Sequence, residues 1–522
     1  MPSAAAPASD LSRRGFLRSA GRGAAALAAA GIASGALRAP GASAAPGSGR
    51  VQPANDPALH LLRRATYGPT PTLAAKVHSM GTTAWLEQQL RPGTIDDTAC
   101  DALITSRFPH LTWTIQQANQ RLDGGAWDLM FDLGVATLAR ACWSKRQLLE
   151  VMVDFWSNHL NVTNPSSDVW NCRHDYDRKV IRAHALGTFE NLLIASAQHP
   201  AMLLYLNNAE SNRDLPNENY GRELLELHTV SVDAGYSEDE MRSSVLLLTG
   251  YGIDWDTGEF HYWKDDHYTG PVKILGFSAK NGSRAGGYQL VLDYLRYLAR
   301  HPMTAAHIAR KLCLRFVSDT PTNGLVNALA RTYVAKGTAI VPVLRQLFHS
   351  AEFAASIGDK TRRPMEDVVA TVRTLGVKPD VSGRDGMEGL YWMVDGLGNA
   401  PGAWSPPDGY PDYALAWASA GGMLGTWNAH MSLAAHWWPD KLVAPDPKSF
   451  LPSPLPATHG ALVQALAKRL VYRTLPTGQR NAVLSLVGRK ASDPLHKQDE
   501  AVTWRLPYLL SLILDSPCHM TR

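Results

Sequence analysis

Short segments with helical apolar spacing, each closed by glycine or proline, recur along the chain and favour a mainly helical fold. Two early helices are predicted over 57–66 and 82–90, ended by Gly68-Pro69 and Pro92-Gly93. A third is predicted from an N-cap at Ser144 to about residue 160. The other helical windows are 178–197, 217–230, 238–248, 289–300, 304–316, 322–335, 339–349, 364–375, 413–435, 459–471 and 499–514.

One segment departs from this pattern and predicts a β-hairpin. Within 252–275, Asp256-Thr257-Gly258 gives a turn signal before the aromatic run that begins at Phe260. The sequence shows neither a repeat of fixed period nor a clean interdomain linker. We therefore predict a mainly α fold: one large multi-helix unit over 57–522, with a small β-hairpin insertion and a candidate boundary between two lobes near 376–388.

The first 44 residues have the features of a twin-arginine export signal. Ser12-Arg13-Arg14-Gly15-Phe16-Leu17 carries the paired arginines, and Ala42-Ser43-Ala44 is a small-x-small cleavage site. We predict a signal peptide over 1–44, recognised by the twin-arginine export machinery, and a flexible lead-in over 45–56. The mature protein is then expected to be secreted or extracytoplasmic.

Charge and cysteine content exclude several protein classes. The chain has 51 Lys+Arg and 47 Asp+Glu, and removal of the signal leaves 46 of each, so no general nucleic-acid footprint remains. No apolar stretch after the signal is long enough for a membrane span. The five cysteines are scattered, which excludes a zinc ribbon and a disulfide scaffold but leaves one or two bridges open.

Familiar catalytic motifs are absent from the sequence. It contains no Gly-x-Ser-x-Gly, no His-Glu-x-x-His, no Walker A string and no strand-linked Gly-x-Gly-x-x-Gly. An ordinary serine hydrolase, a zincin, a P-loop enzyme and a Rossmann dehydrogenase are therefore disfavoured.

The densest run of polar residues lies at 217–229. If this run is helical, Glu218, Arg222 and Glu226 form one line at i, i+4 spacing, with Glu223 beside it. Carboxylates around one arginine can split their pKa values and work as acid and base. The alternative is a salt-bridge stripe that joins helices. Because apolar residues flank the line, we expect it near the core.

A second polar segment lies at the end of the helix predicted from Ser144. His159 follows Phe155 by four residues, which places it on the aromatic face, whereas Asp154 and Asn158 share the adjoining polar face. This histidine is either a ligand-binding residue or a hydrogen-bonded core residue.

Two further segments carry titratable side chains. His174, next to Asp175, is a candidate oriented base, or else the start of a helix with acids in its first turn. His307, Lys311 and Arg315 follow at i, i+4 spacing and form a basic line, which either meets an anionic ligand or lies in water.

Aromatic residues, proline and glycine are dense from 391 to 438, a tract that includes Trp404 and Trp417. Flat aromatic faces match the C–H faces of sugar rings, and the same side chains also fill protein cores. The tract therefore fits either a carbohydrate-binding platform or core packing.

Several strings carry a resemblance to a known family. In chain order they are His60–Gly68, Phe155–His159, Pro200–Leu206, Asn217–Leu227, Leu248–Tyr251, Ile308–Leu312 and Trp404–Trp417. Their order resembles the bacterial family known as domain of unknown function 1800. The resemblance implies an exported, mostly α-helical bacterial protein, and it implies no settled activity. Where family members often show His-Asp before the hairpin glycine, this chain has His267-Tyr268-Thr269-Gly270.

The function that these features favour is an exported hydrolase of an extracellular polymer, with polysaccharide as the substrate class. Glu223 and Glu226 are the first candidate acid/base residues. Because they share one helix, a carboxylate from another segment, such as Asp154, is the natural partner across a cleft. Glu218 is a further acid/base candidate. The candidate binding residues are His159, Arg222, Asn158, His174, Trp404 and Trp417.

Two other classes stay open. The first is a metal- or cofactor-binding exported protein, although the sequence identifies neither a metal nor a cofactor. The second is a non-catalytic binding or assembly factor, in which the charged lines are structural. The candidate ligands for the first class are His159, His174, Glu223, Glu226 and His228.

Overall fold

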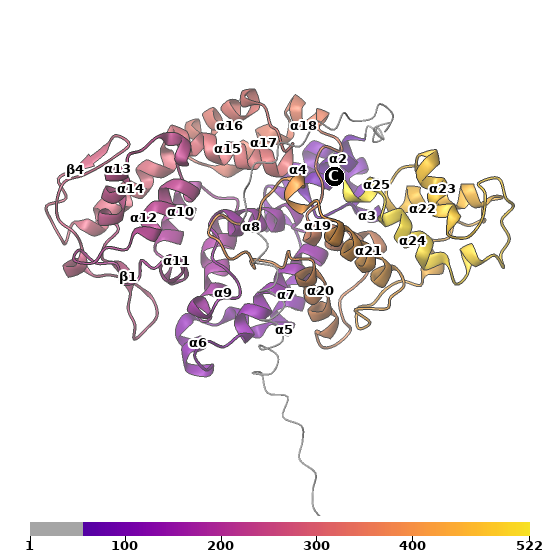
Figure 1. The fold of residues 1–522 in the computed structure, drawn as a ribbon, viewed down its shortest axis with the longest axis horizontal. Coiled ribbons are helices and arrows are strands. Elements are labelled where there is room, and N and C mark those ends of the chain that lie inside the picture. The colour runs from indigo at the N-terminus through magenta and orange to yellow at the C-terminus, as the bar shows by residue number, and fades with distance from the viewer. Residues whose placement is uncertain (1–55) are drawn as a thin grey trace, which may run out of the picture. The chain divides into compact units, whose positions relative to one another are not determined.

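The computed structural model describes residues 56–522, in which helix follows helix with few strands between them (Figure 1). The mainly α prediction is confirmed. The predicted signal peptide over 1–44 and nearly all of the lead-in over 45–56 lie outside the described residues. The lobe boundary near 376–388 stays a prediction.

The helices are short, and their bounds follow local capping signals. Those of the first part are α2 (Pro57–Ala65), α3 (Pro71–Met80), α4 (Thr82–Gln89), α5 (Thr98–Arg107), α6 (Ile115–Arg121), α7 (Asp128–Trp143) and α8 (Gln147–His159). In the middle lie α9 (Arg173–Tyr176), α10 (Phe189–Ala197), α11 (Pro200–Tyr205), α12 (Glu218–Glu223), α13 (Glu238–Leu247), α14 (Gly287–Arg300), α15 (Pro302–Phe316), α16 (Asn323–Ala335), α17 (Ile340–Phe348) and α18 (Ala351–Ala355). The last are α19 (Pro364–Leu375), α20 (Asp385–Gly396), α21 (Ala420–Ala434), α22 (His459–Leu470), α23 (Thr477–Ser485), α24 (Leu506–Leu514) and α25 (Pro517–Met520).

The first helix shows why these segments begin where they do. The carboxylate of Asp56 accepts the Ala58 and Leu59 backbone N–H groups at 2.9 and 3.1 Å. Pro57 occupies the first turn of α2, where a missing N–H costs nothing. An acidic N-cap followed by proline is a helix-start signal that can be recognised in the sequence alone.

Three predicted helix starts are corrected by the structure. Ser144 is not the N-cap of α8: its hydroxyl donates to Asp97 at 2.6 Å and accepts the Arg146 N–H, so the helix begins only at Gln147. The window at 413–435 starts as a 3-10 turn over Ala414–Trp417, and α21 begins at Ala420. Likewise, the window at 499–514 is a 3-10 turn over Glu500–Val502 followed by α24.

Two small antiparallel hairpins interrupt the helices between α13 and α14. The predicted one pairs β1 (Tyr251–Ile253) with β2 (Phe260–Tyr262). A second, which the sequence analysis did not separate, pairs β3 (Val272–Ile274) with β4 (Phe277–Ala279). Its turn places Leu275 and Gly276 at positive φ, a position in which a leucine gives no recognisable turn signal.

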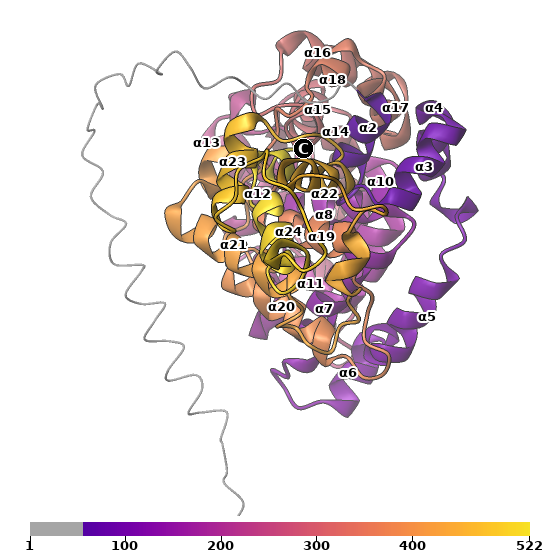
Figure 2. The same cartoon turned by 90° about the vertical axis from the view of Figure 1, so that its right-hand side faces the viewer.

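The core forms between packed helices. In α8, the predicted stripe buries Leu148, Met152 and Trp156 completely. Helix α21 packs against both α19 and α24 (Figure 1 and Figure 2), and α15 packs on α16. All five cysteines are buried and free, so no disulfide bridge forms. Among residues 56–522, no helix is both long and apolar enough to cross a membrane.

Candidate functional site

Four segments that are far apart in the sequence meet at the C-terminal end of α8. His159 ends this helix, and its Nε2 lies 3.1 Å from the backbone oxygen of His228. The Nζ of Lys311, on α15, lies 3.0 Å from Nδ1 of the same imidazole. Asn158 pairs with the backbone of Tyr410, in the loop before α21, through hydrogen bonds of 2.8 and 2.6 Å. Two of the predicted site segments are therefore brought together with the basic line and the aromatic tract.

The segment after α12 changes from an α-helix to a π-helix, η5 (Leu224–His228). Its last carbonyls have no partner inside the helix. Nε2 of His159 donates to the His228 carbonyl, and Nε2 of His307 donates to that of Leu227 at 3.3 Å. His159 and His307 thus cap the C-terminal end of η5. A π-turn in a helix is frequently found at a functional site.

These contacts fix the protonation of the histidines. Because Nε2 of His159 carries the hydrogen, Nδ1 offers its lone pair to the Lys311 ammonium. Burial, together with the nearby Lys311 charge, lowers the pKa of His159 well below its usual value. The same causes lower the pKa of His228 to about 3, and the pKa of His307 to about 4. All three imidazoles are neutral at pH 7, and Lys311 is the cation among them.

Lys311 is itself perturbed. Burial lowers the pKa of its ammonium to about 8, and the negative charges of Asp412 and Asp408 oppose that shift. An amine with a pKa near the working pH can both give and accept protons. The basic line on α15 is therefore not a solvated face: Arg315 is fully buried, and Lys311 and His307 are half-buried.

We expect the amine of Lys311 to react with acetic anhydride along a pH profile with its midpoint near 8. Exposed lysines should instead follow a midpoint near 10.4. Site-resolved competitive labelling read by mass spectrometry measures both. Asp408→Asn removes a charge that raises the pKa of Lys311, so it should move the midpoint lower still. A midpoint of 10 in the unmodified protein would show that Lys311 is hydrated rather than buried beside His159.

The predicted acid/base helix places one perturbed carboxyl at this junction. Glu223 and Glu226 are half-buried, at the end of α12 and within η5. Burial raises the pKa of Glu223, the negative charges of Glu226 and Asp408 raise it further, and Arg222 opposes them. Asp408 comes from the loop before α21, so carboxylates of two separate segments act on the pKa of Glu223.

The loop from 400 to 413 is held in place by polar side chains of the segment after α8. The amide nitrogen of Asn161 donates to the backbone oxygens of Trp404 and Pro406 at 2.9 and 2.8 Å. The hydroxyl of Thr163 also donates to the Trp404 oxygen, at 2.8 Å. The indole N–H of Trp404 then donates to Asp408 at 2.8 Å, which orients this carboxylate.

The two predicted binding tryptophans flank one tyrosine. The ring of Tyr410 lies 5.1 Å from that of Trp404 and 5.7 Å from that of Trp417, measured between centroids. Both tryptophans are half-buried, so each keeps part of its ring in solvent. The aromatic group lies next to Asp408, which makes it a candidate platform beside the carboxylates.

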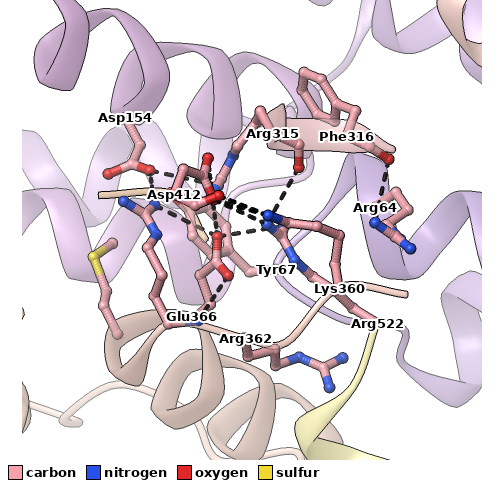
Figure 3. Close-up of polar contacts among 12 residues, drawn as sticks. Arg64, Tyr67, Asp154, Arg315, Phe316, Lys360, Arg362, Glu366, Asp412 and Arg522 are labelled. Carbon is pink, nitrogen blue, oxygen red and sulfur yellow. Dashed lines mark hydrogen bonds and ion pairs between the residues drawn. The ribbon is translucent and has the colours of Figure 1, made fainter. Parts of the chain in front are cut away.

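Beneath this junction lies a central ionic network (Figure 3). It joins four cations to four carboxylates from five parts of the chain, and most of its members are buried. Asp412, at the end of the loop, faces both the network and Lys311. The members are Arg315, Lys360, Arg363 and Arg522, with Asp154, Asp319, Glu366 and Asp412.

Glu366 lies at the centre of the network. Its Oε1 is paired with Arg315 and lies 3.3 Å from Arg522 and 3.4 Å from Arg363. These three guanidinium groups hold the pKa of Glu366 well below its usual value, against the opposing effect of burial. The carboxylate of Glu366 is therefore charged, and its role is structural.

The contacts of two predicted site residues differ from those expected. Asp154 is not free to act as the partner of Glu223, because it is paired with Arg363 and lies 3.4 Å from Arg315. His174 does not contact Asp175: its Nε2 lies 3.0 Å from the Trp113 carbonyl. Asp175 instead pairs with Arg178, Lys179 and His199.

The line of Glu218, Arg222 and Glu226 does not lie near the core as predicted. Glu218 is exposed, and Arg222 forms surface ion pairs of 3.4 Å with Glu218 and with Glu238 of α13. The π-turn also moves Glu226 off the i, i+4 line, because its wider turn breaks the helical spacing. Glu218 and Arg222 therefore form ion pairs at the surface, and their predicted roles stay predictions.

A family model described as a protein of unknown function (DUF1800) matches residues 60–521. The chain belongs to the DUF1800 family. No curated protein and no solved structure shows a significant match. In this DUF1800 chain, the strings that carried the resemblance include both ends of the junction, His159 with Asn158 and the run from Asn217 to Leu227.

The predicted ligand set does not form a metal site in this DUF1800 chain. Among residues 56–522, the single group of three His, Cys, Asp or Glu ligand atoms within 4.8 Å of one another is Asp367, His430 and His519. None of these belongs to the predicted set of His159, His174, Glu223, Glu226 and His228.

Sequence reasoning missed the partner carboxylate Asp408 and nearly all of the ionic network. Asp408 lies in the string Trp404–Trp417, which we interpreted only for its aromatic residues. The two aspartates spaced by four in that string, Asp408 and Asp412, were the signal that could have located it. Three other members of the network lie just before or at the start of α19, namely Lys360, Arg363 and Glu366. Charged residues are common at the start of a helix, so their positions in the sequence gave no sign of a network.

Proposed function

We propose that this DUF1800 protein is an exported hydrolase that cleaves an extracellular polymer, with polysaccharide as its substrate class. The observation that supports it best is Glu223, a half-buried carboxyl whose pKa is raised by burial and by the charges of Glu226 and Asp408. A carboxyl whose pKa is raised beside further carboxylates is the arrangement from which glycoside hydrolases obtain a general acid.

Each residue then has a defined role. The protonated Glu223 gives its proton to the oxygen of the bond that breaks, so the leaving group departs as a neutral hydroxyl. Asp408, from another segment, removes a proton from the attacking water, and the resulting hydroxide oxygen bonds to the sugar carbon. Atoms and charge balance, because Asp408 ends protonated and Glu223 ends ionised.

The remaining groups support these two carboxyls. The Lys311 ammonium, held against Nδ1 of His159, adds a positive charge on which the negative charge of Asp408 acts. Trp404 orients Asp408 through its indole N–H. The half-exposed rings of Trp404 and Trp417 offer flat apolar faces on which a sugar unit can stack.

We expect Glu223→Gln to abolish turnover without weakening the fold. Loss of a general acid reduces the rate by about 10²–10⁴-fold. Because the pKa of Glu223 is raised in the folded protein, its charged form is destabilising above that pKa, and neutral glutamine should leave the melting temperature equal or higher. The activity of the unmodified protein should fall as pH rises through the raised pKa of Glu223. Release of reducing ends from a panel of polysaccharides and a thermal melt measure both effects.

Glu238→Gln is the matched control, because Glu238 is an exposed glutamate that pairs only with Arg222. It should change neither activity nor stability noticeably. A Glu223→Gln protein that unfolds more easily would assign Glu223 a structural role and contradict the proposal. Full activity of that variant on a cleaved polymer would contradict it as well.

A binding or assembly role is the second candidate, and a different surface favours it. The segment from 413 to 427 carries no charged residue and exposes large apolar side chains, among them Leu415 at 79% and Leu424 at 57%. Exposed apolar groups that cluster in this way often mark contact sites. If no polymer is cleaved by protein matured through its own export route, this role becomes the favoured one.

A further inference from the structure

A cavity of about 650 Å³ lies among helices α3, α4, α7 and α19, and none of the junction residues described above lines it. Its walls include Leu73 of α3, Trp85 of α4, Trp143 at the end of α7 and Arg373 of α19. Sites for small molecules usually have volumes of about 300–1,000 Å³, with mostly apolar walls and a few polar groups. The cavity therefore has the size and the kind of lining that a small-molecule site needs.

The guanidinium group of Arg373 is a buried cation in this wall. The residue is only 8% exposed. Its Nε donates to the Gly68 carbonyl and its Nη1 to the Cys142 carbonyl, both at 2.9 Å. Within residues 56–522, Nη2 forms no hydrogen bond, and no carboxylate oxygen lies within 4.0 Å of this side chain. A buried charge is costly unless an opposite charge balances it.

The neighbours of Arg373 do not supply that opposite charge. The titratable groups that act on its pKa are the thiol of Cys142 and the hydroxyl of Tyr472, after the larger effect of burial. Burial raises the pKa of Cys142 to about 12 and also raises the pKa of Tyr472, so both groups are neutral at pH 7. Burial lowers the pKa of Arg373 only to about 10, and its side chain therefore stays charged.

The exposed charges of the lining are positive in sum. Lys76 and Lys145 line the cavity, and Asp96 is the single carboxylate that does so. Hydrogen bonds from Thr98, and then the charge of Lys145, lower the pKa of Asp96. Lys76 donates to the neutral amide of Gln88 at 3.1 Å and has no carboxylate partner. A cleft lined by an excess of one charge attracts ligands of the opposite charge.

The apolar part of the wall suits a flat ring. Trp85 is fully buried, and Leu73 and Ile95 add aliphatic surface. The indole N–H of Trp143 donates to the Val377 carbonyl at 2.9 Å, whereas the buried indole N–H of Trp85 has no acceptor. A buried donor without an acceptor costs free energy. The walls thus combine apolar surface with donors, and a ligand with an apolar body and acceptor atoms complements both.

We propose that this cavity binds a small organic carboxylate with an apolar, ring-containing body. The carboxylate would accept a hydrogen bond from Nη2 of Arg373, and such charge-assisted hydrogen bonds are about twice as strong as neutral ones. A single carboxylate is favoured over a doubly charged phosphate because Arg373 is the one buried charge of the lining. This binding does not depend on the proposed hydrolysis.

The test uses two probes of the same shape on the full-length protein. Isothermal titration calorimetry should show that 3-phenylpropanoate binds at one site per chain with a Kd of about 1 mM or lower. The neutral 3-phenylpropanamide should bind about 10-fold more weakly or not at all. No saturable binding of 3-phenylpropanoate at roughly ten times that Kd would overturn the proposal. Equal affinity for the two probes would overturn the assignment of an anion site.

Variants locate the binding site. Leu73→Trp fills the cavity without removing a polar contact, so it should abolish binding of 3-phenylpropanoate. Met80→Trp is the matched control, because Met80 lies on the same helix, is exposed and does not line the cavity. It should keep the affinity unchanged. Unchanged affinity in Leu73→Trp would place the bound probe elsewhere and contradict the site.

Arg373→Met tests the charge itself. It should weaken binding of 3-phenylpropanoate about 10-fold or more and leave that of 3-phenylpropanamide unchanged. A thermal melt checks that the variant folds, since it also loses two hydrogen bonds to carbonyls, and Leu73→Trp provides the test if it does not. Full affinity in a folded Arg373→Met protein would contradict the proposal. Glu223→Gln should bind the probe normally, so failure of the hydrolase proposal would leave this one intact.

Discussion

Replacing Glu366 with glutamine is expected to lower the free energy of unfolding by about 3–5 kcal/mol, the usual cost of removing one partner from a buried ion pair. Glu366 is almost fully buried, and its carboxylate is shared by Arg315, Arg363 and Arg522. Glutamine keeps the volume of the side chain but removes the negative charge that balances three buried guanidinium groups. Urea denaturation followed by circular dichroism measures the difference.

The control for this effect is Glu87→Gln. Glu87 binds Arg345 through two hydrogen bonds of 2.5 and 2.9 Å, but this pair lies at the surface. An exposed pair contributes about 0–1 kcal/mol, even with good geometry. A comparable loss in both variants would show that burial is not what makes Glu366 important.

The same carboxylate predicts how stability depends on pH. The pKa of Glu366 is held far below its usual value in the folded protein, whereas in the unfolded chain it returns to about 4.3. Its contribution is therefore present above pH ~4.3 and is lost as the pH falls toward the folded-state pKa. Glu366→Gln should flatten part of the acid limb of the stability curve.

Gly409→Ala is expected to displace the loop that carries Asp408. Gly409 has φ +75°, and a β-carbon there would lie closer to the Asn158 backbone oxygen than van der Waals contact allows. The positive φ costs an alanine about 1–2 kcal/mol, and the overlap adds about 1–3 kcal/mol. Because the Asn158–Tyr410 hydrogen bonds flank this contact, activity should fall more than stability alone explains.

Gly398→Ala separates the two effects. Gly398 has φ +73°, but no heavy atom lies within 4 Å of the added β-carbon. The Gly398→Ala variant should lose stability through its positive φ alone, without displacement of the loop that carries Asp408. Equal losses of stability and activity in the two variants would mean that the close approach to Asn158 does not position the loop.

The sequence was sufficient for what local signals determine. Caps such as Asp56 and the hairpin turn at Asp256-Thr257-Gly258 act within a few residues, so they can be recognised without a structure. The polar runs around His159 and Glu223 can also be recognised in the sequence. Their neighbours were not, because nothing local indicates that Lys311 and Asp408 fold against them.

Periodicity failed where the backbone left the α-helix. The assumption of i, i+4 spacing placed Glu226 in line with Glu218 and Arg222, but the π-turn over Leu224–His228 breaks that register. Asp154 was misjudged for a different reason. It forms ion pairs with Arg315 and Arg363, which lie more than 150 residues away in the sequence. Local sequence therefore could not show that Asp154 belongs to the ionic network.

The ionic network also sets a limit on when this protein can finish folding. Arg522 reaches Glu366 and Asp412 from the last position of the sequence, whereas Asp154 is made 368 residues earlier. At about 5–20 residues per second, a ribosome needs roughly 20–70 s to cover that interval. During this time, α8 already exists while the charges that balance it are still being synthesised. The network is therefore completed only after Arg522 has been synthesised, and a nascent chain stalled before that residue carries an unbalanced charge cluster.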